Sequence, residues 1–115
     1  FSRAKAIVWN STGGSNQKFE LVHKGNGNYN IRVNHSGLLL DIEGAANRDG
    51  SSVIQYSPTG GENQTWYFQS QGNGEYAIFS AMNGKVCDIE GAVAFNGAKI
   101  ITYRYKGTDN QLWMF

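Results

Sequence analysis

The sequence predicts a single all-β domain that is built from copies of one unit, and these copies are related by pseudo-threefold symmetry. A chain of 115 residues is long enough for one hydrophobic core and too short for two. Its 15 glycines, single proline and 13% aromatic residues are typical of short strands joined by tight turns, and no segment has helical periodicity. An Asn-Gln pair with an aromatic residue two positions after the Gln recurs every 47 residues, at 16–19, 63–66 and 110–113.

The repeat extends beyond this motif without gaps. The segments 41–45 and 88–92 both read Asp-Ile-Glu-Gly-Ala, and 25–29 matches 72–76 in the same register. Each copy also has an apolar run that ends in an aromatic residue seven positions before its Asn. A fixed period in this range indicates one supersecondary unit that cannot bury its apolar face alone.

These motifs resemble those of the ricin B-chain-type β-trefoil lectins, the Gln-x-Trp repeat carbohydrate-binding modules. The resemblance rests on the Gln-x-aromatic repeat, the Leu-Asp-Ile-x-Gly segment and the apolar run ending in an aromatic residue, and it covers nearly the whole chain. It implies a β-trefoil fold and a carbohydrate-binding function. It also implies galactose or N-acetylgalactosamine as the first candidate ligand and xylan-type polysaccharide as the second.

The middle unit is expected to contain four short strands separated by turn signals. Strands are predicted at 29–33, 38–42, 53–56 and 66–68, with a polar loop over 44–51. Alternation along the fourth strand of each unit directs one set of side chains to the core, namely Phe19, Leu21, Trp66, Phe68, Trp113 and Phe115, and turns Lys18, Thr65 and Leu112 away. The three repeated glutamines, Gln17, Gln64 and Gln111, are expected to bind backbone groups of the loops.

The first repeat is incomplete in this chain. The predicted units are 1–28, 29–75 and 76–115, so the first lacks the counterparts of residues 29–47, including the Asp and two of twelve strands. An open barrel would leave unpaired strand edges. We therefore expect either a cleaved or missing N-terminal segment or a second chain to complete the barrel, and Phe1 in place of an initiator methionine favours the first of these.

The candidate sugar-binding residues come in sets of three. In the middle unit the carboxylate of Asp41 can accept hydrogen bonds from hydroxyls, the ring of Tyr56 can stack on a pyranose, and Asn63 can donate and accept. Carried over from the family position by position, the third unit repeats the set as Asp88, Tyr103 and Asn110. Both aspartates are expected to lie outside the core.

The first unit retains only two positions of this set, Trp9 and Asn16, and is expected to form an incomplete site. Every residue of the sets has a structural alternative as well. An Asp beside a glycine turn often caps the backbone, a Tyr can cover the barrel rim, and Asn is common in turns. The occurrence of the complete Asp, Tyr and Asn set in two units favours a role in sugar binding over the structural alternatives.

Other functions are less well supported. The balance of 10 basic and 9 acidic residues argues against nucleic acid, and the apolar runs are shorter than the roughly 20 residues of a membrane span. Glu43 and Glu90 follow the aspartates by two positions, but no further acid completes a glycosidase pair, so no enzymatic activity is expected. A protein-interaction trefoil, or the targeting module of a larger toxin or glycosidase, remains an alternative.

No cofactor or metal is expected. Asp41, Glu43, Asn47 and Asp49 have oxygen ligands at alternating spacing, but the third unit has Ala94 in place of Asn47, which argues against a calcium loop. His23 and His35 have no partner at metal-ligand spacing. The only cysteine, Cys87, excludes an internal disulfide, leaves the compartment open and is expected to be a small buried hydrophobe at the position of Leu40.

Overall fold

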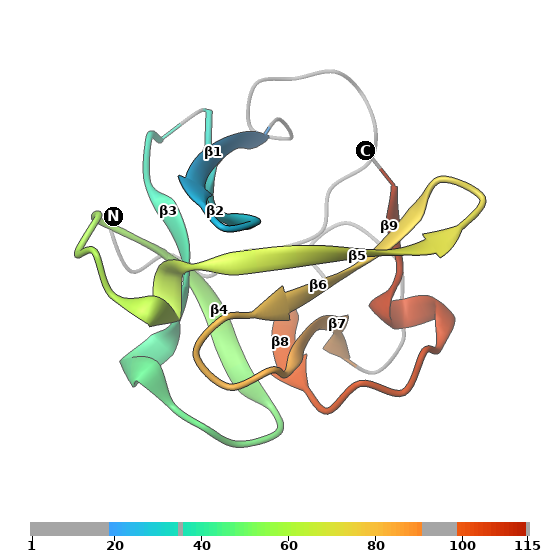
Figure 1. Ribbon diagram of the computed structural model, residues 1–115. Coiled ribbons are helices and arrows are strands. Elements are labelled where there is room, and N and C mark those ends of the chain that lie inside the picture. The colour runs from blue at the N-terminus through green and yellow to red at the C-terminus, as the bar shows by residue number, and fades with distance from the viewer. Residues whose placement is uncertain (1–18, 35, 91–98, 115) are drawn as a thin grey trace.

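Short antiparallel strands follow one another along the chain in the computed structural model, which describes residues 19–34, 36–90 and 99–114 (Figure 1). The strands of this part are β1 (Phe19–Gly25), β2 (Asn28–Val33), β3 (Leu39–Ile42), β4 (Ser51–Tyr56), β5 (Trp66–Gly72), β6 (Glu75–Ser80), β7 (Val86–Ile89), β8 (Ile100–Tyr103) and β9 (Trp113–Met114). The four strands predicted for the middle unit correspond to β2, β3, β4 and β5 and are confirmed within two residues at their starts, β5 running on to Gly72.

Helical structure in the described residues is limited to single 3-10 turns: η2 (Glu43–Ala45), η3 (Glu62–Gln64) and η5 (Asp109–Gln111). The sequence predicts none of them. Two of these turns, η3 and η5, contain the repeated Asn-Gln pairs. In each, the backbone N–H of the Gln donates to the backbone carbonyl three residues earlier. None of the helical segments in this part of the chain is long and apolar enough to span a bilayer.

Two hairpins show how the repeat determines local structure. β1 and β2 are joined by Asn26 and Gly27, and β5 and β6 by Asn73 and Gly74. All four have positive φ, between 54° and 78°. Asn and Gly tolerate this region best, and a two-residue turn with both φ positive matches the twist of antiparallel strands. The same turn therefore forms twice, 47 residues apart.

Strand pairing forms a closed ring of seven strands in the order β2-β3-β4-β8-β7-β6-β5, because β5 also pairs with β2. β1 extends the ring from β2, and β9 extends it from β6. The hairpins β3–β4 and β7–β8 meet through Ser51 and Ser52, which pair with Thr102 and Ile101. The middle and third units are thus joined side by side through equivalent hairpins.

The core lies between these strands and draws residues from both units. Trp66 is fully buried, and its indole Nε1 donates to the Leu40 carbonyl at 3.2 Å; Trp113 makes the equivalent bond to Cys87 at 3.3 Å. Cys87 is 1% exposed, and burial raises the pKa of its thiol well above the ordinary range. The prediction that it is a buried hydrophobe is confirmed.

The prediction of a buried inner face is wrong for β1, where Phe19 and Leu21 are each 42% exposed. Trp66 on β5 lies between β2 and β6, whereas β1 pairs with β2 alone among the described strands. Phe19 still faces inward, because it lines an apolar cavity of about 50 Å³ together with Ile31, Leu40, Ile78, Cys87, Ile100 and Trp113. The inward direction of the Phe19 side chain was therefore predicted correctly, but its burial was not. Lys18 and Phe115 lie outside the described residues.

Candidate functional site

The three predicted residues of the middle unit lie around one cavity beside the β3–β4 hairpin. Asp41 comes from β3, Tyr56 ends β4, and Asn63 lies in η3. They line a cavity of about 210 Å³ whose remaining wall is formed by Gly44, Ala45, Ile54 and Thr59. The structure therefore brings an acceptor, an aromatic ring and an amide to one small cavity.

Asp41 is the centre of a hydrogen-bond network in this unit. Its Oδ1 accepts from Asn63 Nδ2 at 3.2 Å, and its Oδ2 accepts from Gln64 Nε2 at 2.8 Å. Asp41 is 3% exposed, so the prediction that it lies outside the core is wrong. A buried carboxylate is tolerated because charge-assisted hydrogen bonds replace its hydration. The amides on η3 provide those bonds.

Gln64 links the aspartate to the loop that precedes η3. Its Nε2 also donates to the Ser57 carbonyl at 2.9 Å, and its Oε1 accepts from the Thr59 amide at 2.9 Å. The side chain is 1% exposed. Gln64 therefore lies beneath the site and contacts backbone groups, which is the kind of contact expected from the sequence.

The third unit repeats this network almost atom for atom. Asp88 accepts from Asn110 Nδ2 at 3.0 Å and from Gln111 Nε2 at 2.8 Å, and it is also 3% exposed. Gln111 donates to the Arg104 carbonyl at 3.0 Å and accepts from the Lys106 amide at 2.7 Å. For Asp88, too, the expectation of a position outside the core is wrong for the same physical reason.

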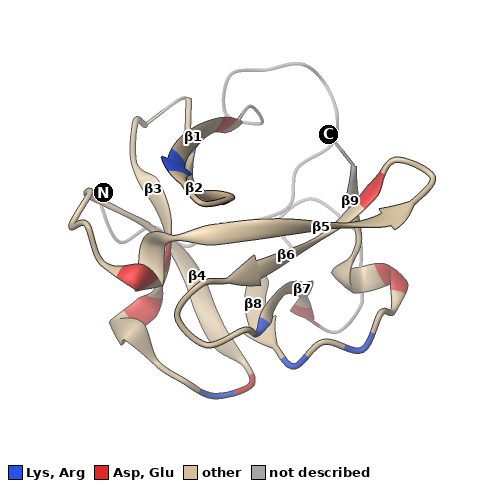
Figure 2. Ribbon diagram, in the orientation of Figure 1, with Lys and Arg blue, Asp and Glu red and all other residues tan. Residues whose placement is uncertain are grey.

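The two tyrosines have different surroundings. Around Tyr103 the guanidinium carbon of Arg104 lies 5.1 Å from the ring centroid and the ammonium of Lys106 lies 4.8 Å from it. Both distances fit cation–π contacts. Figure 2 shows basic residues along the segment that follows β8, whereas residues 57–61 after β4 carry no charge. These two cations were not predicted from the sequence, although the difference between segments 57–61 and 104–108 indicates them.

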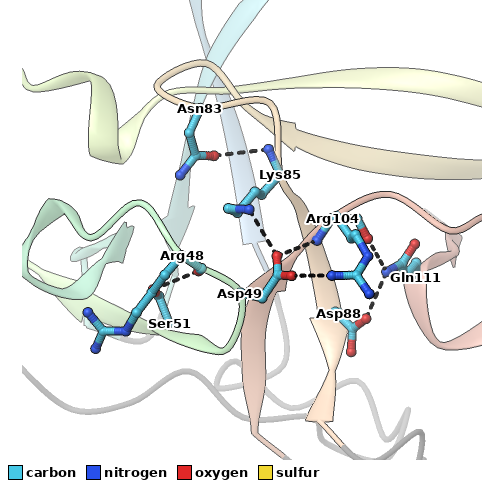
Figure 3. A network of polar contacts seen from close by, with 8 residues as sticks. All are labelled: Arg48, Asp49, Ser51, Asn83, Lys85, Asp88, Arg104 and Gln111. Atoms are coloured by element: carbon cyan, nitrogen blue, oxygen red, sulfur yellow. Dashed lines mark hydrogen bonds and ion pairs between the residues drawn. The ribbon is translucent and has the colours of Figure 1, made fainter.

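A second polar network joins the two units. Asp49, in the loop between η2 and β4, accepts from Lys85 Nζ at 2.9 Å, from Arg104 Nη1 at 2.7 Å and from the Arg104 amide at 2.9 Å (Figure 3). The hydrogen bond from Lys85 is the largest cause of the lowered pKa of Asp49. Its carboxylate is thus held by cationic side chains, which makes it a poor calcium ligand.

Among the described residues, the remaining metal-ligand candidates are not assembled into a site. In residues 19–34, 36–90 and 99–114, no group of three His, Cys, Asp or Glu side chains is placed to hold a metal ion. His23 is exposed, and its ring lies 5.1 Å from that of Tyr29. His35 and the first-unit residues Trp9, Asn16 and Gln17 lie outside the described residues.

Comparison with known families identifies the chain. A model described as ricin-type beta-trefoil lectin domain-like matches residues 2–56 and 62–115. The chain belongs to the ricin-type β-trefoil lectin domain-like family. The predicted all-β trefoil class and the resemblance stated from the motifs are therefore confirmed. Comparison with curated protein sequences gave no match.

Solved structures share the fold of this ricin-type lectin domain. ThreeFoil, a designed threefold-symmetric protein, is 42% identical with a TM-score of 0.95, over 99% of this chain and 81% of that one. An exo-β-1,3-galactanase from Clostridium thermocellum is 35% identical with a TM-score of 0.89, over 92% of this chain and 23% of that one. The Polyporus squamosus lectin is 26% identical with a TM-score of 0.75, over 97% and 46%. The chain thus spans only part of these two natural proteins.

Proposed function

We propose that the chain is a carbohydrate-binding module without catalytic activity of its own, with one sugar site in the middle unit and one in the third. The observation that carries the proposal is the Asp, Tyr and Asn set, present twice on equivalent elements. Corresponding hydrogen bonds in the two networks differ by 0.2 Å or less. A protein-binding epitope has no need of such repetition.

Hydroxyl recognition follows from the orientation of the carboxylates. A carboxylate oxygen can accept two hydrogen bonds, so a sugar hydroxyl can share Oδ1 of Asp88 with the amide of Asn110. Gln111 holds the other oxygen and prevents rotation of the group. The site is therefore oriented before the ligand arrives, which lowers the entropic cost of binding.

The size of the middle cavity supports a single sugar residue. Its volume of about 210 Å³ is below the range of about 300 to 1,000 Å³ typical of drug-sized ligands. Single-site affinity is expected on the order of 0.1 to 1 mM. Two such sites on one domain would bind clustered glycans more tightly than either site alone.

Galactose or N-acetylgalactosamine is the proposed sugar class, with xylan-type polysaccharide second. The galactanase is named for a galactose polymer, and the Polyporus squamosus lectin is described bound to Neu5Acα2-6Galβ1-4GlcNAc, which contains galactose. The galactanase, of which this chain covers 23%, also favours a second candidate role as the targeting module of a larger glycosidase.

Heteronuclear NMR titration tests the proposal directly. We expect galactose and N-acetylgalactosamine to shift amide signals near Tyr56 and Asn63 in the middle unit, and we expect Tyr56→Ala to reduce affinity there at least tenfold because the stacking surface is lost. The same variant should leave the third unit unaffected. Unchanged spectra with galactose, N-acetylgalactosamine and xylose at 20 mM would contradict the binding of neutral sugars by either unit.

A further inference from the structure

The aromatic platform of the third unit carries two cations that the middle unit lacks. Arg104 and Lys106 occupy the positions of Ser57 and Thr59, one repeat later. Both are exposed side chains whose charged groups lie within 5.1 Å of the Tyr103 centroid. The acidic residues in and before the 3-10 turns match, since Asp41 corresponds to Asp88 and Glu62 to Asp109. Between the segments 57–63 and 104–110, the two cations are therefore the difference in charge.

The two cations differ in what neutralises them. Arg104 forms an ion pair with Asp49 at 2.7 Å, and Asp49 is shared with Lys85 at 2.9 Å. The ion pairs of the described residues are these two and Arg32 with Glu20, so no described carboxylate lies within 4 Å of the Lys106 ammonium. Lys106 thus contributes a positive charge at the face of Tyr103 whose only described contact is the ring itself.

This charge changes which ligand fits the third unit. A neutral pyranose that stacks on the Tyr103 face occupied by the ammonium must displace it and gains no charged partner in return. A sugar with an anionic substituent can instead form a charge-assisted hydrogen bond with the displaced ammonium. The third unit is consequently better suited to an acidic sugar than to a neutral one.

A hydroxyl next to the asparagine adds to this difference. Thr108 Oγ1 donates to Asn110 Oδ1 at 2.6 Å, so this acceptor is already engaged in the third unit. The middle unit has Gly61 at that position, which cannot donate from a side chain; a Cβ there would lie 2.6 Å from Asn63 Oδ1. The middle unit therefore offers more acceptor capacity to neutral hydroxyls, and the third unit offers more donors.

We propose that the third unit selects sugars that carry a carboxylate or a sulfate, whereas the middle unit binds neutral sugars. This inference rests on the proposed function, because it assumes that both units bind sugars. Lys106 is the residue that determines the preference, with Tyr103 as the platform and Asp88 and Asn110 as the hydroxyl-binding pair.

The test compares galactose, galacturonic acid and galactose 6-sulfate in separate NMR titrations of the full chain. At low salt we expect the acidic sugars to bind the third unit about tenfold more tightly than galactose, with the preference reduced at 0.5 M NaCl by screening. The carboxylate and sulfate arms show which anion is preferred. Galactose should act chiefly on signals of the middle unit.

Exchanging the residues at positions 59 and 106 tests whether the lysine causes the preference for acidic sugars. Lys106→Thr gives the third unit the residue of the middle unit and should remove the preference for acidic sugars there. Thr59→Lys should introduce that preference into the middle unit. Both positions are exposed, so neither change should alter the unfolding midpoint by more than a few degrees.

The inference would be overturned if the third unit bound galactose as tightly as both galacturonic acid and galactose 6-sulfate, or if its preference were unchanged in Lys106→Thr. Failure of the proposed function gives a different result. If the third unit prefers the acidic sugars while the middle unit ignores every neutral sugar, the selectivity inferred for the third unit stands, and the neutral-sugar site proposed for the middle unit is wrong. If neither unit binds any sugar, both proposals are wrong.

Discussion

The middle and third units share a scaffold and differ in the loop above it. In both, the aspartate accepts the Gln amide at 2.8 Å, and the Gln is bound to the backbone of the preceding loop. The loop itself reads Ser-Pro-Thr-Gly-Gly at 57–61 and Arg-Tyr-Lys-Gly-Thr at 104–108. The buried polar contacts of the two units are thus the same, whereas the exposed positions a few residues away differ.

The strongest way to separate the two units is to remove the core indoles. Trp66 is completely buried and Trp113 is half-buried, although they make the same hydrogen bond. Trp66→Ala should lower the free energy of unfolding by about 3–5 kcal/mol, and Trp113→Ala by clearly less. Urea denaturation followed by tyrosine fluorescence or circular dichroism measures both. Equal losses would mean that the units are packed alike.

Replacement of Gln64 and of Gln111 should instead destabilise the protein to the same extent. Gln64→Ala removes three hydrogen bonds and leaves a buried oxygen of Asp41 with one partner fewer, so a loss of about 2–3 kcal/mol is expected. Gln111→Ala should have the same effect through Asp88. Gln69→Ala, at an exposed position of β5, is the control and should change the unfolding free energy by less than about 0.5 kcal/mol. If the losses in unfolding free energy of Gln64→Ala and Gln111→Ala differed by more than twofold, the two scaffolds would not be equivalent.

The smallest effect is expected where the two units are joined by charge. Asp49→Asn should weaken the contact with Lys85 and Arg104 only slightly, because these pairs are near the surface. The folded-state pKa of Asp49 is lowered, so its stabilisation is present above the ordinary value of 3.8 and is lost as the pH falls through the folded-state value. Thermal unfolding of both proteins at pH 7 and at pH 2.5 tests this. A difference that persists unchanged at the lower pH would contradict the ion-pair explanation.

The sequence predicted the fold because the repeat carries its main determinants. The Asn-Gly turns, the strand alternation and the Gln-x-aromatic motif each recur in phase, so one unit predicts the next. The burial of the core side chains was harder to predict, because it depends on neighbouring strands that the repeat does not specify. Phe19 has the same motif position as Trp66, yet β1 has one partner strand among those described and β5 has two. The unit boundaries 1–28, 29–75 and 76–115 stay predictions.

The residues proposed from the sequence for the middle unit lie around one cavity, but the burial of the aspartate was not predicted, and their role in sugar binding stays a prediction. The motif identified Asp41, Tyr56 and Asn63, but it gave no sign that Gln64 would hold the aspartate inside the protein. Lys106 could not be predicted from the repeat, because its counterpart in the middle unit is Thr59.

Asp49 also limits how the units can be exchanged. Its three partners are groups of Lys85 and Arg104, whose counterparts in the middle unit are Leu38 and Ser57. A third unit rebuilt as a copy of residues 29–75 would keep the barrel motifs but leave this carboxylate facing a leucine and a serine. The middle and third units are therefore not interchangeable, and a symmetrised version of this chain would have to change Asp49 together with Lys85 and Arg104.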